Sequence, residues 1–235
     1  IALAVMNPSD NLLIDNNCLL LGALYSDHDN WHIPNTKYPD GSFALFRNTE
    51  KYCEVVSDPV GSRTIWYYFD KKLFVSSTSQ RAIIMFLNSL EFNEKVIPWV
   101  LSSGSLGPDY AWDKRIKRIH PDSSILLNKS DWSLIEKKTR IEFNEKKLSA
   151  INHKKNLNEK LKETFDQLQL DYSKWYLPLS GGYDSRGILC FLANIQSNES
   201  NLKTITWGLS SAIKDMETDA YVAKKLSLHY GISHK

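Results

Sequence analysis

Short hydrophobic segments alternate with polar turns from the start of the chain to about Lys138. Asp, Gly and Pro gather between the segments, as at Pro39-Asp40-Gly41 and Asp58-Pro59-Val60-Gly61. Apolar runs bounded by turn residues predict strands that pair with their neighbours in an antiparallel sheet. The expected strands are Ile1–Val5, Leu19–Leu24, Ser42–Phe46, Glu54–Ser57, Ile65–Phe69, Leu73–Ser76, Ile116–Ile119, Ser123–Leu127 and Trp132–Lys137.

Two helices are expected within this β-rich part. Ser79–Leu87 carries apolar residues at helical spacing, and Val96–Leu101 follows the polar residues Asn93 and Glu94. An antiparallel β-sandwich with packed helices, an α+β arrangement, is therefore predicted for residues 1–145.

The pattern changes after residue 145. A long helix rich in Lys and Asn is expected over Leu148–Tyr172, with its apolar positions on one face. Strand and helix then alternate, which predicts the start of an α/β domain with a parallel sheet over residues 146–235. The expected order is strand Trp175–Leu179, helix Asp184–Asn194, strand Lys203–Trp207 and helix Thr218–Tyr230.

The composition is that of an ordinary globular protein, with 42% hydrophobic and 24% charged residues. The 29 basic and 27 acidic residues leave a net charge of +2. This nearly even balance of basic and acidic residues indicates neither a nucleic acid nor an anionic membrane as partner. No apolar run is long enough to span a bilayer. The three isolated cysteines, Cys18, Cys53 and Cys190, suit a reducing compartment, so we expect a cytoplasmic protein.

The most informative stretch is Leu177-Pro178-Leu179-Ser180-Gly181-Gly182-Tyr183-Asp184-Ser185-Arg186, where a predicted strand ends and a helix begins. Gly181 and Gly182 let the backbone approach a ligand closely, and amides of the first helical turn favour an anion. The hydroxyls of Ser180 and Ser185 can donate to phosphate oxygens, and the Asp184 carboxylate can hold Mg²⁺. The segment therefore predicts a pyrophosphate site.

This segment differs from two common nucleotide loops, because the chain contains neither G-x-x-x-x-G-K-[ST] nor G-x-G-x-x-G. The alternative is a Gly-Gly turn that leads into a helix capped by Asp184, without any ligand. Arg186 likewise has two interpretations: it reaches a phosphate, or it is a solvated helix residue paired with an acid.

The segment resembles the S-G-G-x-D-S loop of the N-type ATP pyrophosphatases, and the flanking sequence resembles the asparagine synthetase branch of that group. Downstream, Thr204-Ile205-Thr206-Trp207-Gly208-Leu209 and Asp215-Met216-Glu217 resemble that branch's second strand and acidic loop. Upstream, Asp58-Pro59-Val60-Gly61-Ser62-Arg63 and Ile116-Lys117-Arg118-Ile119-His120-Pro121 resemble parts of its Ntn-hydrolase-like glutaminase domain.

The resemblance implies an ATP-dependent enzyme that activates a carboxylate as an acyl-adenylate, releases pyrophosphate and joins the acyl group to an amine or ammonia. It implies ATP and Mg²⁺ as cofactors, with the metal on Asp184 and the substrate a small-molecule or peptide carboxylate. A homodimer is compatible with it. The residues expected at ATP or pyrophosphate are Leu179, Ser180, Gly181, Gly182, Asp184, Ser185, Trp207 and Gly208. For Trp207 the alternative is an indole buried in the core.

The chain departs from the family pattern at several points. It starts with Ile1, whereas a glutaminase of this type needs an N-terminal cysteine with a free α-amine. We therefore expect a degenerate glutaminase-like part, and a C-terminally truncated second part because only residues 175–235 follow the long helix. Two alternatives remain: a cyclase of the β-lactam or lasso-peptide type that uses its substrate's own amine, and an inactive binding or scaffold module.

Overall fold

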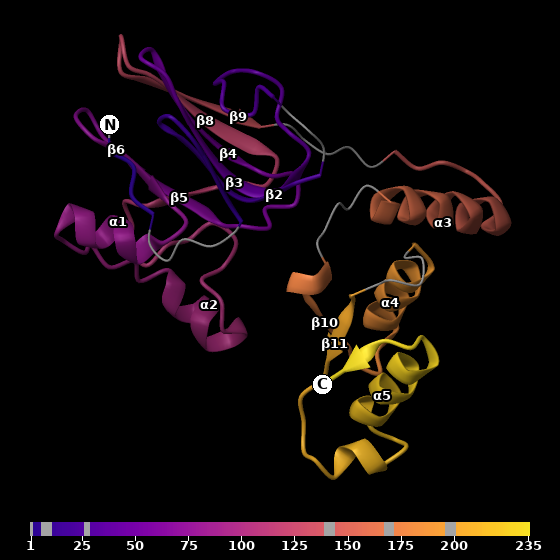
Figure 1. Cartoon of the computed structure of the whole chain (residues 1–235). Coiled ribbons are helices and arrows are strands. Elements are labelled where there is room, and N and C mark those ends of the chain that lie inside the picture. Colours follow the sequence, from indigo (N-terminus) through magenta and orange to yellow (C-terminus); the bar gives the residue numbers. More distant parts are fainter. Residues whose placement is uncertain (1, 6–10, 26–28, 139–143, 167–171, 196–200) are drawn as a thin grey trace. The chain divides into compact units, whose positions relative to one another are not determined.

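The structure is a computed structural model that describes residues 2–5, 11–25, 29–138, 144–166, 172–195 and 201–235. It divides into two compact units, Ile1–Asn144 and Glu145–Lys235, each described here by itself (Figure 1). Both units mix strands and helices, with antiparallel sheets in the first unit and a parallel sheet in the second. Their assignment to a glutaminase-like and a synthetase domain remains a prediction.

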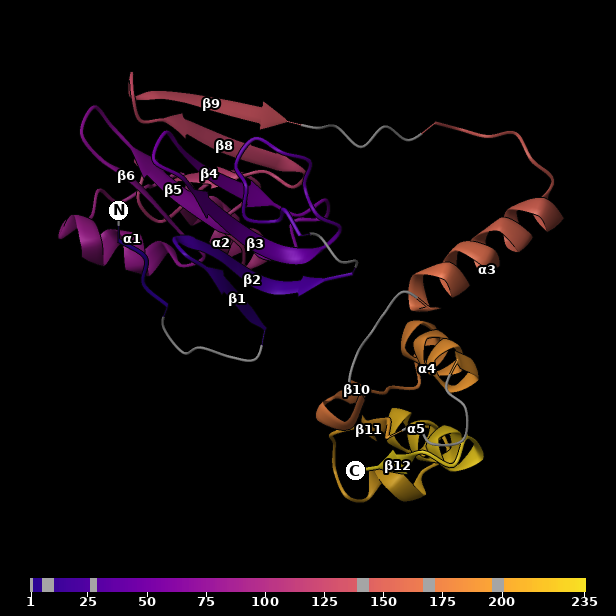
Figure 2. The same cartoon turned by 45° about the horizontal axis from the view of Figure 1, so that its top comes forward.

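The larger sheet of the first unit has six strands in the order β1-β2-β3-β4-β8-β9 (Figure 2). All neighbouring pairs are antiparallel. The strands are β1 (Leu12–Asp15), β2 (Cys18–Leu24), β3 (Gly41–Asn48), β4 (Tyr52–Ser57), β8 (Ser123–Asn128) and β9 (Ser133–Lys138). Side chains alternate between its two faces, so the central strands β3 and β4 bury residues on both sides.

A second antiparallel sheet covers one face of this six-stranded sheet. It consists of β5 (Ile65–Phe69), β6 (Phe74–Ser77) and β7 (Lys117–Ile119), in the order β6-β5-β7. The two sheets share one hydrophobic core, to which both contribute buried residues: Ala44, Val55, Ile65, Tyr67, Ile119 and Ile125. The first unit is therefore a β-sandwich, as the sequence pattern predicts.

Two short helices lie beyond the three-stranded sheet. In α1 (Gln80–Leu87) the Ser79 hydroxyl caps the first turn, and Ile83 packs with Trp66 of β5. Helix α2 (Val96–Ser103) ends at Gly104, whose φ of 68° lies in the left-handed region.

A buried carboxylate fastens the chain that follows α2. Burial by itself raises the pKa of Asp113, but hydrogen bonds from Arg115 and from the Glu91 amide outweigh it and lower the pKa to about 2. Arg115 Nη2 lies 2.6 Å from Asp113 Oδ2, and the Glu91 amide nitrogen lies 2.9 Å from the same oxygen. Asp113 is therefore ionised near neutral pH.

An irregular segment, residues 29–40, covers the opposite face of the six-stranded sheet. Trp31 and Tyr38 pack against a core formed by Leu20, Phe43, Leu45 and Val56. Among these apolar residues lie Arg47 and Glu54, both with fully buried side chains. The segment therefore has to satisfy two buried charges as well as cover a hydrophobic face.

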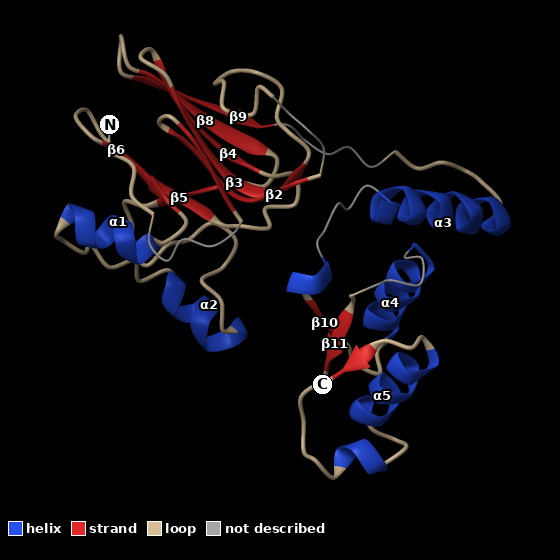
Figure 3. Ribbon diagram, in the orientation of Figure 1, coloured by secondary structure: helices blue, strands red, loops and turns tan. Residues whose placement is uncertain are grey.

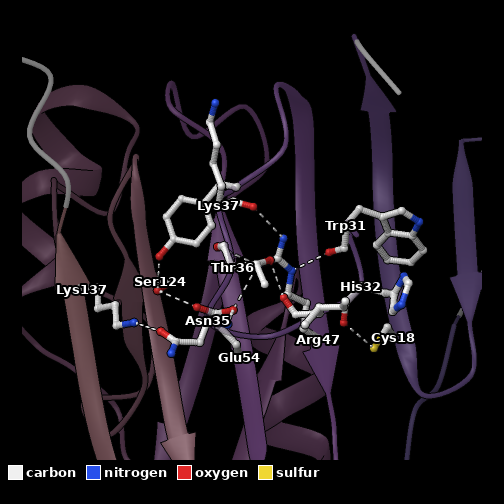
Figure 4. A network of polar contacts seen from close by, with 12 residues as sticks. Cys18, Trp31, His32, Asn35, Thr36, Lys37, Arg47, Glu54, Ser124 and Lys137 are labelled. Carbon is white, nitrogen blue, oxygen red and sulfur yellow. Dashed lines mark hydrogen bonds and ion pairs between the residues drawn. The ribbon is translucent and has the colours of Figure 1, made fainter. Parts of the chain in front are cut away.

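Arg47 and Glu54 are direct cross-strand neighbours on β3 and β4. Arg47 Nη1 lies 3.2 Å from Glu54 Oε2. The guanidinium also donates to the main-chain carbonyls of the covering segment: Nε to Trp31 at 2.6 Å, Nη1 to Thr36 at 3.5 Å and Nη2 to Lys37 at 3.4 Å (Figure 4). One buried side chain thus holds the covering segment at three carbonyls.

Glu54 is held by the same surroundings. Its Oε2 accepts from the Asn35 amide at 2.8 Å, and its Oε1 accepts from the Ser124 hydroxyl at 3.4 Å. The Ser124 hydroxyl in turn lies 2.7 Å from the Tyr38 hydroxyl. The network therefore joins strands β3, β4 and β8 to the covering segment.

In its described residues the second unit contains a three-stranded parallel sheet and the α-helices α3, α4 and α5 (Figure 3). Strands β10 (Tyr176–Pro178), β11 (Lys203–Ile205) and β12 (Ser233–His234) are joined through α4 (Tyr183–Ile195) and α5 (Asp219–His229). Residues of both helices share one core with the sheet, namely Leu179, Leu189, Leu192, Leu202, Ala223 and Ile232. The strand-helix alternation predicted after residue 172 is confirmed.

Helix α3 (Ala150–Asp166) precedes the sheet. A separate 3-10 helix, Tyr172–Lys174, lies between α3 and β10 in the sequence. The ring of Phe165 stacks on Phe191 of α4, with centroids 5.1 Å apart. None of the side chains of α3 is fully buried. The predicted helix Leu148–Tyr172 is thus longer than the observed one, and its residues 167–171 lie outside the described part of the chain.

The structure differs from the predicted elements at three other places. Residues 2–5 form no strand, because they pair with neither sheet, and Ile1 lies outside the described residues. Strand β1 was not expected, although Asn16 at φ 50° makes a tight turn between Leu12–Asp15 and Cys18–Leu24. Strand β12 is a third parallel strand where only two were predicted, and its two residues leave no hydrophobic pattern.

No helix in the described part of the chain is long and apolar enough to cross a bilayer.

Replacing Glu54 by Ala tests the buried ion pair. The substitution leaves the Arg47 cation buried without its partner, so we expect the free energy of unfolding to fall by about 3–5 kcal/mol. Urea denaturation followed by tryptophan fluorescence measures it. Glu136→Ala is the control, because its pair with Lys138 (3.4 Å) is exposed and should contribute less than about 1 kcal/mol. Equal losses in the two variants would contradict a structural role for the buried pair.

Candidate active site

The loop 179–182 leads from the carboxyl end of β10 into the first turn of α4. Leu179 is buried in the core of the unit, and its amide donates to the Ile205 carbonyl at 2.9 Å, which extends the pairing with β11 beyond β10. Ser180 and Gly181 then leave the sheet at the edge where parallel strands end. Ligands of open α/β sheets bind at this edge.

The two serine hydroxyls of the loop are used within the loop itself. The Ser180 amide donates to Ser185 Oγ at 3.1 Å, and the two Oγ atoms lie 2.9 Å apart. The Gly182 amide donates to Ser180 Oγ at 3.2 Å. Ser180 and Ser185 therefore fix the path of the loop, a role that the sequence analysis did not assign, and their contact with a phosphate remains a prediction.

Gly181 lies directly against the start of α5. A Cβ at this position would come within 2.2 Å of Asp219 Oδ1 and 3.2 Å of Asp219 Cα. The loop and the first turn of α5 can be this close only because residue 181 has no side chain. Asp219 was not recognised from the sequence, although its signal was visible: an acid directly after Thr218, the N-cap of α5.

Thr206 was also missed as a positioning residue. Its hydroxyl donates to the carbonyl of Leu179, the residue that opens the loop, and its amide donates to the Lys235 carbonyl at 3.0 Å. Thr206 therefore fixes the carboxyl ends of β10 and β11 relative to each other, which sets where the loop begins.

Asp184 occupies the first turn of α4, and its side chain is exposed. Its carboxylate is favoured there by the unpaired amides of the helix start. Mg²⁺ in nucleotide sites is usually held by one or two carboxylates together with phosphate oxygens. No cluster of three or more His, Cys, Asp or Glu side chains suited to a metal occurs among the described residues. A single exposed carboxylate fits a metal that arrives with a phosphate.

Among the ion pairs of the described residues Arg186 has no acidic partner, and its contact with a phosphate remains a prediction. Its Nε donates to the Gly182 carbonyl at 3.2 Å, and its guanidinium lies over the Tyr183 ring, 4.5 Å from the centroid. Tyr183 itself is 87% exposed. Arg186 is thus held beside the loop by a carbonyl and an aromatic face instead of an acid.

Trp207 and Gly208 follow the carboxyl end of β11. The Trp207 side chain is 75% exposed, so the alternative of an indole buried in the core is wrong. A Cβ on Gly208 would meet no atom within 4 Å, which leaves open space beside it. The predicted contact of these residues with adenine remains a prediction.

The predicted acidic loop ends in a helix cap. The Asp215 carboxylate accepts from the Glu217 amide at 3.1 Å, and the Thr218 hydroxyl accepts from the Tyr221 amide at 3.3 Å. Asp215 and Glu217 are exposed. Their local bonds shape the approach to α5.

The first unit holds the motif that resembles a glutaminase domain, and there it makes a turn. Asp58 is buried, and its carboxylate accepts from the amides of Phe43, Val60 and Ser62 at 3.0–3.2 Å. Gly61, at φ 64°, packs against Pro121. The Asp58-Pro59-Val60-Gly61 sequence therefore joins β4 to β5 and holds the hairpin before β8.

Neither cysteine of the first unit is placed as a nucleophile. Cys18, in β2, is 3% exposed, and its Sγ accepts from the Asn48 amide at 3.1 Å. Burial raises the pKa of Cys53, in β4, to about 11. A thiol with so high a pKa carries little thiolate near neutral pH.

No protein-family model matches this chain, and no curated protein matches it in sequence. Among solved structures, it is similar to glutamine phosphoribosylpyrophosphate amidotransferase from B. subtilis complexed with ADP and GMP. The match has 11% identity and a TM-score of 0.29 and covers 95% of this chain. It covers 47% of that chain, so this chain spans about half the length of the amidotransferase. At this TM-score we transfer neither the nucleotides nor the activity.

Replacing Gly181 by Ala tests the contact between the loop and α5. The added Cβ would lie 2.2 Å from Asp219 Oδ1, which can turn away, and 3.2 Å from Asp219 Cα, which has to shift, so we expect the second unit to lose about 1 kcal/mol of stability, the low end of the range for overpacking. Thermal unfolding followed by circular dichroism measures the loss. Gly187→Ala is the matched control: it lies in the same segment, inside α4, and its Cβ would meet nothing within 4 Å. Ala is the better helix former, so Gly187→Ala should stabilise by about 0.5–1 kcal/mol.

Proposed function

We propose that this chain is part of an ATP-dependent amide-forming enzyme similar to asparagine synthetase. The observation that carries the proposal is the loop Ser180–Ser185, which places a Gly-Gly turn, a helix start and the exposed Asp184 carboxylate at the carboxyl edge of a parallel sheet. These are the parts that pyrophosphate recognition requires.

In this proposal the loop binds the β- and γ-phosphates of ATP. A carboxylate oxygen of the substrate attacks the α-phosphorus, and the bond from that phosphorus to the bridging oxygen of pyrophosphate breaks. An amine or ammonia then attacks the acyl carbon, and AMP leaves. The amides of the first turn of α4 would face the negative charge that grows on the departing pyrophosphate, and Asp184 would hold a Mg²⁺ whose charge favours that leaving group.

The Leu179 and Thr206 contacts support the loop's part in this reaction. Leu179 is fixed in the core, and the Thr206 hydroxyl holds its carbonyl, so the start of the loop is fixed before any ligand arrives. The Ser180 and Gly182 amides donate within the loop, so the proposed donors to the anion are the amides of the first turn of α4. Preorganised donors stabilise charge without a cost of reorientation during the reaction. Trp207 and Gly208, at the same edge, are the proposed contacts of the adenine.

The nitrogen source favours one variant of the proposal. With Cys18 buried and the pKa of Cys53 raised to about 11, the first unit offers no reactive thiolate for glutamine. Because neither Cys18 nor Cys53 serves glutamine, we propose free ammonia or an amine of the substrate itself as the acceptor nitrogen, and the second option is the reaction of a cyclase. An inactive binding or scaffold module is the alternative of another class, and ATP binding distinguishes it.

The first test concerns Asp184. In isothermal titration with ATP and Mg²⁺, we expect Asp184→Asn to weaken binding roughly ten- to hundredfold, the value of one charge-assisted contact of about 1.5–3 kcal/mol. Labelled pyrophosphate should exchange into ATP only when the right carboxylate is present, and the variant should abolish that exchange.

Asp166→Asn is the matched control, because Asp166 is an exposed aspartate of the same unit at the end of α3. It should leave ATP binding unchanged. Absence of ATP binding by the unaltered chain would favour the scaffold alternative, and equal binding by Asp184→Asn would remove that residue from the metal site.

The second test concerns glutamine. We expect the 235-residue chain to release no glutamate from glutamine, because neither cysteine of the first unit combines an exposed thiolate with an adjacent free α-amine. An enzyme-coupled glutamate assay measures the release, with Cys18→Ala and Cys53→Ala as controls. Glutamate release that either substitution abolishes would contradict the burial argument.

A further inference from the structure

The helices of the first unit expose an unusual amount of apolar surface. Six large side chains define what we call the helix-layer surface: Met85, Phe86, Phe92, Ile97, Trp99 and Leu101. Their exposed fractions run from 42% for Trp99 to 82% for Leu101. Single exposed apolar residues are common, but six of them within α1, α2 and the short segment between these helices indicate an interaction site.

Helix α2 is the centre of this surface. Its sequence starts Val96-Ile97-Pro98-Trp99-Val100-Leu101 and is apolar all round, yet Val96 is the one residue of α2 that is buried. A helix that is apolar on every side is normally buried. Its exposure here indicates that another surface covers it.

Side-chain contacts connect the parts of the chain that carry the helix-layer surface. The rings of Phe92 and Trp112 stack with their centroids 6.3 Å apart. The Trp112 amide donates a 2.8 Å hydrogen bond to the side chain of Gln80, the first residue of α1. The segment before α2 is thereby attached to α1, which packs on the three-stranded sheet through Ile83. A partner therefore meets a preformed surface.

The area matches that of a protein dimer. With aromatic side chains of about 150–250 Å² each, the exposed fractions of these residues and of nearby Leu90 and Trp112 leave on the order of 800 Å² of accessible surface. A standard interface buries roughly 800 Å² per partner. This surface is therefore large enough for a stable dimer.

The charge of this region favours a second copy of the chain as the partner. Between Gln80 and Arg115 there are four basic residues and four acidic residues: Arg81, Lys95, Lys114, Arg115, Glu91, Glu94, Asp109 and Asp113. A neutral surface gives no attraction to an anionic membrane or to nucleic acid. It also gives no repulsion between two copies of itself, so it suits an isologous contact.

We propose that two copies of this chain form a symmetric dimer through the helix-layer surface, with α2 at its centre. The dimer proposal is independent of the proposed ATP site, whose residues belong to the second unit. In the dimer, Trp99 and Leu101 of each copy are covered by the apolar residues of the other copy.

The test is the mass of the full 235-residue chain by size-exclusion chromatography with light scattering, over roughly 1–100 μM, the range of a micromolar Kd. We expect twice the mass of one chain. Leu101→Glu should raise the Kd at least about thirtyfold, as expected for an interface anchor, so its mass should fall toward that of one chain at concentrations where the unaltered chain is dimeric. Its circular dichroism should stay unchanged, because Leu101 is 82% exposed.

Val60→Glu is the matched control, because Val60 is 75% exposed in the turn before β5, outside the helix layer. It should leave the dimer intact. Ile97→Ser is a milder second variant, in case Leu101→Glu unfolds α2. Hydrogen exchange of residues 96–103 adds a separate reading, and their protection should increase with protein concentration.

Three results would overturn the proposal. One is a single-chain mass at every concentration. Another is an equal loss of the dimer in Val60→Glu and Leu101→Glu, since the contact then lies elsewhere. The third is protection of residues 96–103 that does not depend on concentration, because another part of the same chain then covers α2.

Discussion

The ion pair of Arg47 and Glu54 is the constraint on which the first unit depends. Two charges without solvent contact are costly unless each remaining donor and acceptor is matched. Here the matching groups are main-chain atoms of an irregular segment, which donates one amide and offers three carbonyls. A stretch with no regular secondary structure is thereby given one conformation, and the hydrophobic face around Leu45 and Val56 is covered. The six-stranded sheet can then bury both faces, one against this segment and one against the second sheet.

The second unit reaches a similar precision with smaller groups. Its loop is shaped by two hydroxyls, a carbonyl held by Thr206 and the missing side chain of Gly181, with no buried charge. Asp184 and Tyr183 are left at the surface. The division is physically sensible for the proposed function: groups that hold the loop are engaged with one another, whereas the group proposed to meet the metal is free to do so.

Much of the fold could be predicted because its signals are local. Strands β2 to β9 and helix α1 correspond to short apolar runs separated by polar or turn residues, and α4 follows a Gly-Gly turn into an apolar stripe. Strand β12 could not be predicted, because its two residues become a strand only through pairing with β11. Only part of the candidate site could be predicted. Its loop consists of consecutive residues and is recognisable from the sequence, but Asp219 and Thr206 contact that loop from positions distant in the chain.

The sequence by itself determined the elements, the division into a β-rich part and an alternating part, and the place of the Ser180–Ser185 loop at a strand end. These depend on residues close together in the chain, whose spacing sets which side chains share a face. Only the tertiary structure decided that Arg47 meets Glu54 in the core, that Ser180 bonds Ser185 instead of solvent, and that α2 stays uncovered within its unit. Burial and pairing between distant residues are properties of packing, and no local pattern encodes which distant group supplies the partner.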